Sequence, residues 1–374
     1  MQRTVLITGG AGFIGSFVAD RLLSRGDRVR LLDRLDPQVH PQGPPEHLPR
    51  EAEFRVADVR DKVAVLDALA GVDVVVHCAA AVGVAQSLYR VQHFIDANVG
   101  GTAVLLEALA ERREAPVRLI IPTSMTGYGE GVYRRPSDGG QIRIPIRTRE
   151  EVSVRGWEPV DPESGEVVVP APTPEDAALL ATNVYALSKR YQEELALALG
   201  RTYGFPVTCL RLFNVYGPRQ SLSNPYTGVL AIFLSRLLAG HPPVVYEDGL
   251  QSRDFVSVHD VARAIELAIE TPACAGRVIN VGSGEARAIG EVARILARLV
   301  GRDDLVPEIR GEFRSGDVRH CVADTRLARR LLGFSPTVRW EEGLAEVVEW
   351  ARRAPAEDAF ARAAEELRAH GLVS

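Results

Sequence analysis

The stretch "TVLITGGAGFIGSFVADRLL", residues 4–23, constrains the fold of this chain more than any other. A β-branched and apolar run precedes Gly9, Gly12 and Gly15, and an apolar pattern with helical spacing follows them. Glycines between a strand and a helix allow a tight turn and a close approach of the backbone to a ligand. The stretch therefore predicts a strand–turn–helix unit of a parallel α/β sheet.

Further short apolar runs alternate with longer helical segments along the first two thirds of the chain. The predicted strands are residues 4–8, 28–33, 54–58, 73–79, 117–124 and 206–212. Several of these runs lack the period-2 alternation of a half-exposed strand, as expected for parallel strands covered by helices on both faces. The fold class is therefore α/β, a doubly wound parallel sheet of the Rossmann type with its ligands at the carboxyl ends of the strands.

The regular alternation loosens after residue 213, where Gly-, Pro- and Asn-rich loops separate helices expected near residues 259–270, 286–300 and 341–352. We assign most of this region to a smaller, mixed α/β C-terminal lobe that binds substrate. The predicted core spans residues 1–212 and is rejoined by about 253–283, and the predicted lobe comprises 213–252 and 284–374.

Two proline-rich stretches interrupt this organisation. Residues 36–50 are expected to form a solvent-exposed loop. Residues 130–176 form an insertion that is too long and too rich in Pro and Gly for an ordinary connection, which indicates a functional lid or a disordered excursion.

Composition excludes several classes of function. The net charge of −5 is spread without a basic block, so neither a nucleic acid nor a membrane surface is an expected partner. No apolar run approaches about 18 residues, and no leader pattern precedes the first strand, so we expect a cytoplasmic enzyme. No metal site or disulfide framework is expected, because the four cysteines are far apart and lack metal-ligand spacing; they are Cys78, Cys209, Cys274 and Cys321.

The glycine turn and an acid after it point to a dinucleotide. Backbone N–H groups and the dipole at a helix N-terminus can meet the charge of a pyrophosphate. Asp33 ends the second predicted strand, where it can bind the ribose diol of an adenosine and repel a 2′-phosphate. This favours NAD over NADP, although the adjacent Arg34 could serve a 2′-phosphate. Asp58 ends the third predicted strand. Its carboxylate either reaches the adenine of the dinucleotide or only caps a loop.

Tyr185 and Lys189 lie four residues apart in a predicted helix, "ATNVYALSKRYQEE", and therefore share one face of it. Tyrosine has a pKa of about 10, but a neighbouring ammonium favours its phenolate. Ser124 ends the strand 117–124, where its hydroxyl can donate to the same substrate oxygen. Beside the glycine turn, Tyr185 is a candidate general acid/base and Lys189 a candidate ligand of the nicotinamide ribose.

Five motifs carry a family resemblance: GGAGFIG, the YxxxK pair, RLFNVYGPRQ, RDFVSVHDVARA and FRSGDVRH. Through them the chain resembles the nucleotide-sugar epimerase and dehydratase branch of the extended short-chain dehydrogenase/reductase family. The resemblance implies a catalytic triad of Ser124, Tyr185 and Lys189, and a homodimer. With Tyr185 and Lys189, the implied NAD contacts are Gly9, Gly12, Phe13, Ile14, Gly15, Asp33, Asp58, Val59, Ala79, Ala80 and Asn98. The implied nucleotide-sugar contacts are Thr126, Asn214, Arg253, Arg314 and Asp317.

The two residues after Ser124 reduce the number of reactions that the resemblance allows. Sugar 4,6-dehydratases carry an Asp-Glu pair there, and decarboxylases of this branch usually carry Glu at the first position. This chain has Met125 and Thr126, neither of which can act as a carboxyl acid or base. The remaining reactions are 4-epimerisation, in which C4 is oxidised and reduced again, and a net oxidation or reduction of the sugar. A non-catalytic NAD-binding regulatory protein is a third hypothesis.

The insertion and the segment "RQSLSNPYTGVLAIF" are similar to those of dTDP-L-rhamnose 4-epimerases and related deoxysugar enzymes. This similarity implies a dTDP-6-deoxyhexose as the substrate. The residues themselves identify neither the sugar nor the nucleobase, because the shape of the pocket depends on its loops.

Overall fold

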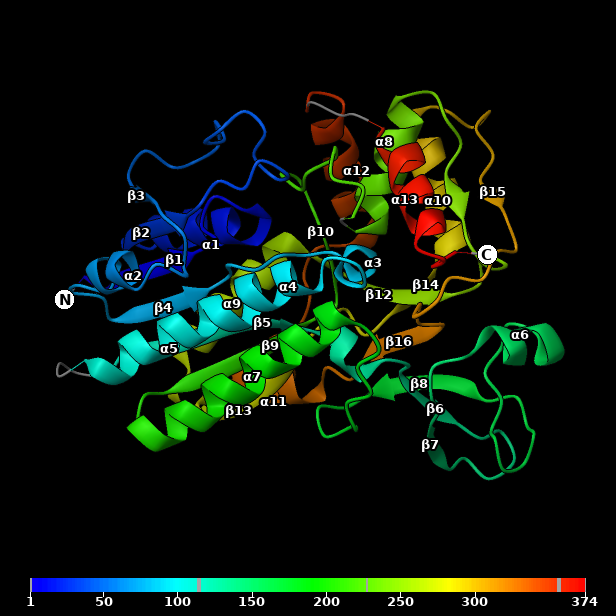
Figure 1. The fold of residues 1–374 in the computed structure, drawn as a ribbon, viewed down its shortest axis with the longest axis horizontal. Coiled ribbons are helices and arrows are strands. Elements are labelled where there is room, and N and C mark those ends of the chain that lie inside the picture. Colours follow the sequence, from blue (N-terminus) through cyan, green and yellow to red (C-terminus); the bar gives the residue numbers. More distant parts are fainter. Residues whose placement is uncertain (1, 113–115, 227, 355–357, 374) are drawn as a thin grey trace.

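The structure, a computed structural model, describes residues 2–112, 116–226, 228–354 and 358–373. Its centre is a seven-stranded sheet in the order β13-β9-β5-β4-β1-β2-β3, in which every pairing is parallel (Figure 1). The strands are β1 (Thr4–Thr8), β2 (Arg28–Asp33), β3 (Glu53–Val56), β4 (Val74–His77), β5 (Arg118–Ser124), β9 (Val207–Leu212) and β13 (Arg277–Val281). The strand order reverses between β1 and β4, which makes their carboxyl ends the expected ligand crevice. The predicted doubly wound parallel sheet is confirmed.

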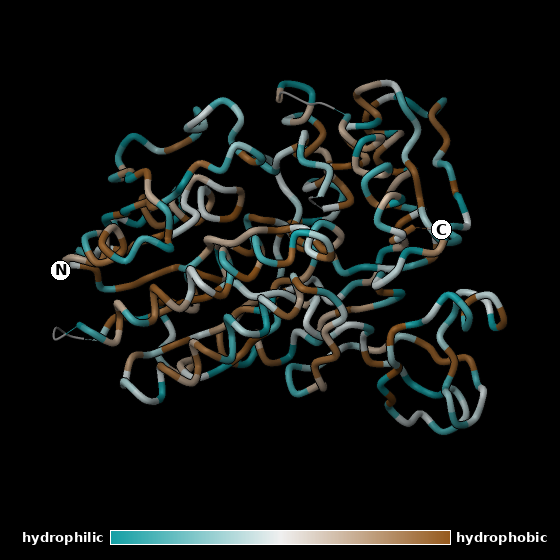
Figure 2. The backbone as a smooth tube through the Cα atoms, in the orientation of Figure 1, coloured by the Kyte–Doolittle hydropathy of each residue, from teal (hydrophilic) through white to brown (hydrophobic). Residues whose placement is uncertain are grey.

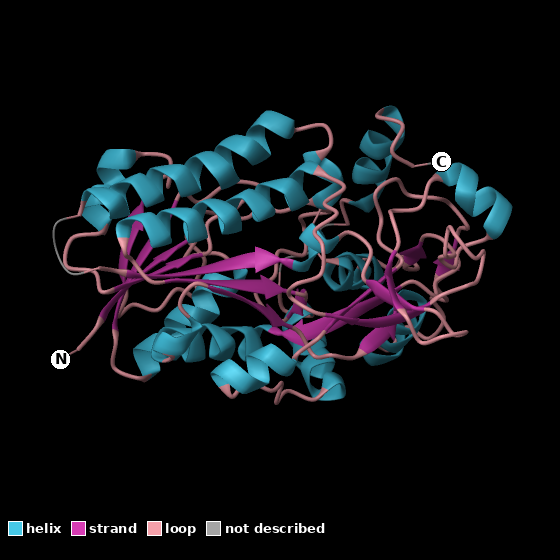
Figure 3. Cartoon of the chain, turned by 90° about the horizontal axis from the view of Figure 1, so that it is seen from below, coloured by secondary structure: helices cyan, strands magenta, loops and turns pink. Residues whose placement is uncertain are grey.

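Helices cover both faces of this sheet, as Figure 3 shows. One layer contains α1 (Phe13–Ser24), α9 (Val258–Glu270) and α11 (Arg326–Leu332). The other contains α2 (Lys62–Ala68), α5 (Gly101–Glu111) and α7 (Val184–Tyr203). This half also contains the short helical segments α3 (Val84–Ser87), α4 (Val91–Phe94), the π-helical turn η1 (Ile95–Gly100) and the 3₁₀ turns η2 (Met125–Tyr128) and η3 (Pro272–Cys274).

Two hydrophobic cores, one on each face, explain why the strands are apolar throughout. In β1, Val5 and Ile7 pack with α1 and α9, whereas Leu6 packs on the other face with α2 and α5. Alternate residues of a strand point to opposite faces, so a strand buried on both sides needs apolar residues at every position. Figure 2 shows these apolar residues along the central strands.

A second sheet has the order β10-β12-β16-β8-β6-β7, with β14 paired to β12. Its strands are β6 (Val132–Arg134), β7 (Gln141–Arg143), β8 (Val169–Thr173), β10 (Asn214–Tyr216), β12 (Ser252–Ser257), β14 (Ala286–Ala288) and β16 (His320–Ala323). Beside it lie α8 (Val229–Leu238), α10 (Ile289–Val300), α12 (Trp340–Ala351), α13 (Phe360–Ala369) and the pair β11 (Val244–Val245) and β15 (Glu308–Ile309). The expected helix at 286–300 is therefore shorter, because its first three residues pair with β12.

The insertion 130–176 is neither a disordered excursion nor a lid over the ligand crevice. It forms β6, β7, β8 and α6 (Arg149–Arg155), and β8 pairs with β16 (Figure 1). A buried network of charges fixes it to the C-terminal half of the chain. Arg147 donates to Glu247 over 2.8 Å, and the Glu130 carboxylate accepts from the Arg319 backbone N–H over 2.9 Å. The length of the insertion therefore reflects the strands β8, β6 and β7, which extend the second sheet beyond β16.

No helix of the described residues is long and apolar enough to cross a membrane.

Candidate active site

A cavity of about 590 Å³ opens at the carboxyl ends of β1, β4 and β5 and continues toward the second sheet. Its volume is in the range of small-molecule sites. Of the residues predicted from the sequence, all but Asn98 line it: Gly9, Gly12, Phe13, Ile14, Gly15, Asp33, Asp58, Val59, Ala79, Ala80, Ser124, Thr126, Tyr185, Lys189, Asn214, Arg253, Arg314 and Asp317. The fold thus brings together residues that lie more than 300 positions apart.

The glycine turn forms one end of the cavity. Gly9 has a φ of +68°, and a Cβ atom there would lie 2.7 Å from the backbone nitrogen of Ala79. Gly12 precedes α1 and has no side chain to cap the helix, so the first N–H groups of α1 are left for another acceptor. A side chain at Gly15 would collide with the Gly9 carbonyl oxygen. Such a cradle fits the pyrophosphate of a dinucleotide.

Asp33 is held at the end of β2 by two backbone groups. Its carboxylate accepts hydrogen bonds from the Ala11 N–H over 3.1 Å and from the Leu35 N–H over 2.9 Å. Arg34 is the residue that could bind the 2′-phosphate of NADP. Its guanidinium pairs with Asp36 and lies 3.5 Å from an oxygen of Asp58. A guanidinium with two carboxylate partners is less available to a 2′-phosphate, so the surroundings of Arg34 favour NAD.

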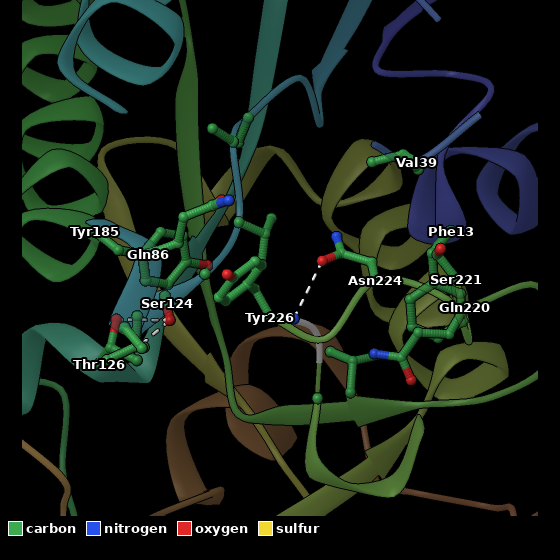
Figure 4. Close-up of a pocket in the computed structure, with 18 of the residues that line it drawn as sticks. Phe13, Val39, Gln86, Ser124, Thr126, Tyr185, Gln220, Ser221, Asn224 and Tyr226 are labelled. Atoms are coloured by element: carbon green, nitrogen blue, oxygen red, sulfur yellow. Dashed lines mark hydrogen bonds between the residues drawn. The ribbon is translucent and has the colours of Figure 1, made fainter. Parts of the chain in front are cut away.

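Ser124, Thr126 and Tyr185 come together at the middle of the cavity (Figure 4). Ser124 is the last residue of β5, and the 3₁₀ turn η2 (Met125–Tyr128) follows it. The Ser124 hydroxyl accepts a hydrogen bond from the Thr126 hydroxyl over 2.9 Å. Ser124 also lies close enough to Tyr185 to lower the pKa of its phenol, so the two hydroxyl groups lie on the side of the cavity where Tyr185 is placed.

Tyr185 lies in the first turn of α7, where Asn183 caps the helix. Its backbone N–H donates to the Ser87 hydroxyl over 3.0 Å, and its ring meets Phe94 edge-on at 6.3 Å between centroids. These contacts fix the phenol against the cavity wall. Neither Ser87 nor Phe94 was predicted as a site residue, since nothing local in the sequence connects them to Tyr185.

Without a bound ligand, the protein does not lower the pKa of Tyr185 as the sequence predicts. Burial raises the pKa of Tyr185 to about 12, and the nearby Ser124 hydroxyl opposes only part of that rise. Burial also lowers the pKa of Lys189 to about 8, and its Nζ donates to the Pro122 carbonyl oxygen over 3.2 Å. Because the charged forms of both groups are poorly solvated here, bound ligands must supply any stabilisation of the phenolate.

Apart from Thr126 in η2, the predicted nucleotide-sugar residues lie on β10, on β12 and before β16. Arg253 donates to Asp317 over 2.7 Å. Although burial opposes it, the two arginines Arg253 and Arg314 hold the pKa of Asp317 below its usual value. Asn214 has a buried Oδ1 with no hydrogen-bond partner among the described residues. Two arginines, an ionised carboxylate and a free amide oxygen suit a diphosphate and the hydroxyl groups of a ribose.

Asn98 does not reach the cavity. It is fully buried in η1, where its amide bonds both backbone groups of Ala81 and donates to the Ser188 hydroxyl. The spacing in sequence could not show this, because a π-helical turn redirects the side chain. Asn98 instead supports the cavity wall formed by Ala79, Ala80 and Ala81.

The loop 36–50, expected to be exposed, lines part of the cavity through Gln38, Val39 and His40. The Gln38 amide donates to Gln86 over 3.3 Å and to Asn224 over 3.2 Å, so it joins three segments around the cavity. In Figure 4 Val39 and Asn224 lie toward Phe13, away from Ser124. A proline-rich composition gave no sign of these contacts.

A doubly wound sheet with a glycine turn and a Ser, Tyr and Lys cluster at one crevice defines a nucleotide-binding enzyme of the short-chain dehydrogenase/reductase type. The NAD dependent epimerase/dehydratase family matches residues 5–151 and 163–282, and this chain belongs to that family. A dTDP-L-rhamnose 4-epimerase from Burkholderia thailandensis is 36% identical over 357 residues, which cover 93% of this chain and 94% of the relative.

Solved structures agree with this family. A UDP-glucose 4-epimerase from Thermotoga maritima, solved with UDP-glucose, has a TM-score of 0.76 and 30% identity and covers 94% of this chain and 99% of its own. The Thermus thermophilus UDP-glucose 4-epimerase, solved with NAD, has a TM-score of 0.73 and 30% identity, and covers 94% of this chain and 100% of its own. The predictions of a sugar-nucleotide enzyme and of NAD as cofactor are confirmed.

Other relatives include a dTDP-glucose 4,6-dehydratase and a UDP-N-acetyl-alpha-D-glucosaminuronate decarboxylase, so membership of the family leaves the reaction open.

We expect Asp33→Asn to weaken NAD binding about tenfold and to reduce the preference for NAD over NADP, because it removes the charge that we predict to face the adenosine ribose. Titration of the protein with each dinucleotide, followed by fluorescence, measures both effects. Asp67→Asn, on the exposed face of α2, is the matched control and should change neither. An unchanged preference in Asp33→Asn would assign the discrimination to other residues.

Proposed function

We propose that this protein is an NAD-dependent nucleotide-sugar 4-epimerase that acts on a dTDP-6-deoxyhexose. The sheet core would hold NAD, and the C-terminal lobe would hold the nucleotide sugar. The observation that carries the proposal is the composition of the centre of the cavity. Ser124, Tyr185 and Lys189 line it together, whereas Met125 and Thr126 occupy the positions where dehydration or decarboxylation needs a carboxyl group.

The chain's own groups carry the proton in this reaction. Tyr185, as the phenolate, takes the proton of the O4 hydroxyl, and Ser124 donates a hydrogen bond to the same oxygen. Lys189 binds the ribose next to the reacting ring and supplies a positive charge near the phenolate. Bound NAD supplies the hydride acceptor and donor at C4. Once the 4-keto sugar has turned over in the site, Tyr185 returns the proton, so that protons and electrons balance over one cycle.

The relative with 36% identity, a dTDP-L-rhamnose 4-epimerase, supports a deoxysugar as the substrate.

The test is incubation of the purified protein with dTDP-, UDP- and GDP-sugars, with product stereochemistry followed by NMR and reduced nicotinamide by absorbance. We expect a 4-epimer of a dTDP-6-deoxyhexose to form without net change in the cofactor. Product that appears only with stoichiometric consumption of NADH or NADPH would favour an oxidoreductase, and no product with any sugar would favour a regulatory NAD-binding protein.

A further inference from the structure

The insertion reaches the candidate active site through one arginine, Arg143 of β7. Strand β7 lies at the edge of the second sheet, where Arg143 is in register with Val132 of β6. The Val132 N–H in turn donates to the Thr173 hydroxyl of β8 over 3.0 Å. The backbone of Arg143 is therefore held by the sheet, which gives its side chain a rigid base.

The guanidinium of Arg143 joins two segments that lead to candidate catalytic residues. Its Nη2 donates to the carbonyl oxygen of Tyr128, which ends η2, the turn that follows Ser124. The same Nη2 donates to the Ala178 carbonyl oxygen over 3.0 Å, in the loop between β8 and α7. This loop leads to Tyr185 in the first turn of α7. One side chain of the insertion therefore binds a segment on either side of the two residues, which line the same cavity (Figure 4).

The turn and the loop also touch through apolar side chains and through the backbone. Leu179 packs against the apolar cluster that contains Tyr128. Gly129 has a φ of +66°, and a Cβ atom there would lie 2.4 Å from the Leu180 carbonyl oxygen. Such packing brings the two segments close, but it is non-directional, whereas a hydrogen bond also fixes an orientation.

Hydrogen bonds from the described residues hold the loop at its two ends and once between them. The Arg211 guanidinium donates to the Glu175 carbonyl oxygen over 2.9 Å near the start, and Asn183 caps α7 at the end. Within residues 176–182, the bond from Arg143 is the one hydrogen bond that reaches another segment of the described chain. Arg143 is therefore the directional tie of the middle of this loop.

The turn after Ser124 is fixed by contacts other than Arg143. The Tyr128 hydroxyl donates to Asn280 Oδ1 over 2.7 Å and accepts a hydrogen bond from Arg211 over 2.8 Å. Both partners belong to strands of the central sheet. The turn is thus a fixed reference, and the bonds of Arg143 set the loop against it.

The position of this guanidinium is unfavourable by itself. Burial lowers the pKa of Arg143, and its Nε is buried without a hydrogen-bond partner among the residues that the structure describes. Its hydrogen bonds go to backbone carbonyl oxygens, that of Glu130 being the third. An apolar side chain of similar length would fill the same space at a lower cost of desolvation, so what an arginine adds at this position is direction.

We propose that Arg143 is a positioning residue, which holds the loop before Tyr185 against the turn after Ser124 and so sets the distance between the Ser124 hydroxyl and the Tyr185 phenol. The inference rests on the proposed function for the roles of these two groups, and it gives the insertion a part in the reaction. Proton transfer depends steeply on such distances, since a displacement of about 1 Å can lower a rate about 10²-fold.

The kinetic test is the substitution Arg143→Ala, assayed with the sugar nucleotide that gives turnover in the panel described above. We expect kcat to fall by about 10–10²-fold, because the two hydroxyl groups lose their mutual position. The KM for the sugar nucleotide and the affinity for NAD should stay close to those of the unchanged protein. Added guanidinium ion fills the space left by the side chain and should restore part of kcat.

The matched control is Arg134→Ala, on the exposed face of the paired strand β6. It removes the same group from the same insertion and should neither lose activity nor respond to guanidinium ion. Unchanged kcat in Arg143→Ala would overturn the proposal, and so would a rise in KM that accounts for the whole loss.

A cycle of variants with Ser124→Ala separates positioning from a general loss of stability. If Arg143 acts through the distance between Ser124 and Tyr185, the double variant loses less activity than the product of the two single losses. Losses that multiply would show that Arg143 acts independently of Ser124, which would overturn the proposal.

Hydrogen exchange of the NAD-loaded protein tests the tie without turnover. The substitution Arg143→Lys keeps the charge and the stem of the side chain but loses the planar fork that serves two segments, so it suits the case in which Arg143→Ala does not fold. Amides of residues 125–129 and 176–182 should exchange faster in Arg143→Lys than in Arg134→Ala. Unchanged exchange in both segments would overturn the proposal. Faster exchange in a protein that forms no epimer with any sugar would support the tie and overturn only the proposed reaction.

Discussion

Replacement of Tyr185 by Phe should lower kcat by about 10²–10⁴-fold, because it removes the group that exchanges a proton with the substrate. The ring contact with Phe94 involves no oxygen, so Phe should keep the packing of α7. We therefore expect folding and NAD affinity close to those of the unchanged protein. Single-turnover formation of the epimer measures the loss, and titration with NAD checks that the cofactor site is intact.

The control for this substitution is Tyr191→Phe, six positions further along α7, where the side chain is 44% exposed. It removes the same hydroxyl group from the same helix outside the cavity and should leave kcat unchanged. Near-normal turnover of Tyr185→Phe would remove Tyr185 from the mechanism. A loss of NAD binding together with turnover would instead indicate a structural role.

Replacement of Lys189 by Met should have opposite effects on stability and on cofactor binding. Burial lowers the pKa of Lys189 from 10.5 to about 8. One pKa unit corresponds to about 1.4 kcal/mol, so the ammonium destabilises the NAD-free fold by up to about 3 kcal/mol at pH 7. Met fills a similar volume without a charge. We expect a higher free energy of unfolding, reduced by the lost hydrogen bond to Pro122, and NAD binding weaker by about tenfold or more.

The pH dependence of this gain has a definite sign. Below pH 8 both states bind the proton, and the full cost of the buried ammonium is present. Between pH 8 and 10.5 the unfolded chain holds the proton more tightly than the folded chain, so the stability of the unchanged protein rises with pH. The advantage of Lys189→Met should therefore shrink through this range and vanish above it.

Urea unfolding of the NAD-free proteins at several pH values measures this effect. The control is Lys62→Met at the N-terminus of α2, where the ammonium is exposed and a change within about 0.5 kcal/mol is expected. A lower stability of Lys189→Met at pH 7 would mean that the ammonium is better solvated than its burial implies. Unchanged NAD affinity would separate Lys189 from the ribose.

Parts of the site that depend on short stretches of chain could be predicted from the sequence. The glycine spacing at Gly9, Gly12 and Gly15 predicts a strand–turn–helix unit, because the tight turn requires glycine at these positions of the backbone. Tyr185 and Lys189 share a face because four residues make about one helical turn. Asn98 shows the limit of such reasoning, since the π-helical turn η1 turns it behind the wall of the cavity.

The insertion and the C-terminal helix could not be predicted, since their environment consists of distant segments. Residues 130–176 indicated a lid because their composition resembles that of a long loop. Their place is set by β16 and by Glu247 and Arg319, which lie about 70 or more positions further along the chain. Likewise the Glu366 carboxylate of α13 accepts hydrogen bonds from Tyr89 and Tyr226, which lie 277 and 140 positions away.

The sequence by itself predicted the class of fold and the cofactor, because both rest on hydrophobic periodicity or on residue types at fixed short spacing. Tertiary structure alone decided what surrounds the candidate site: the solvation that moves the pKa values of Tyr185 and Lys189, the supporting place of Asn98, and the part of the cavity lined by α13. The physical reason is that burial and cavity shape are sums over contacts between remote segments, and no short window of sequence contains them.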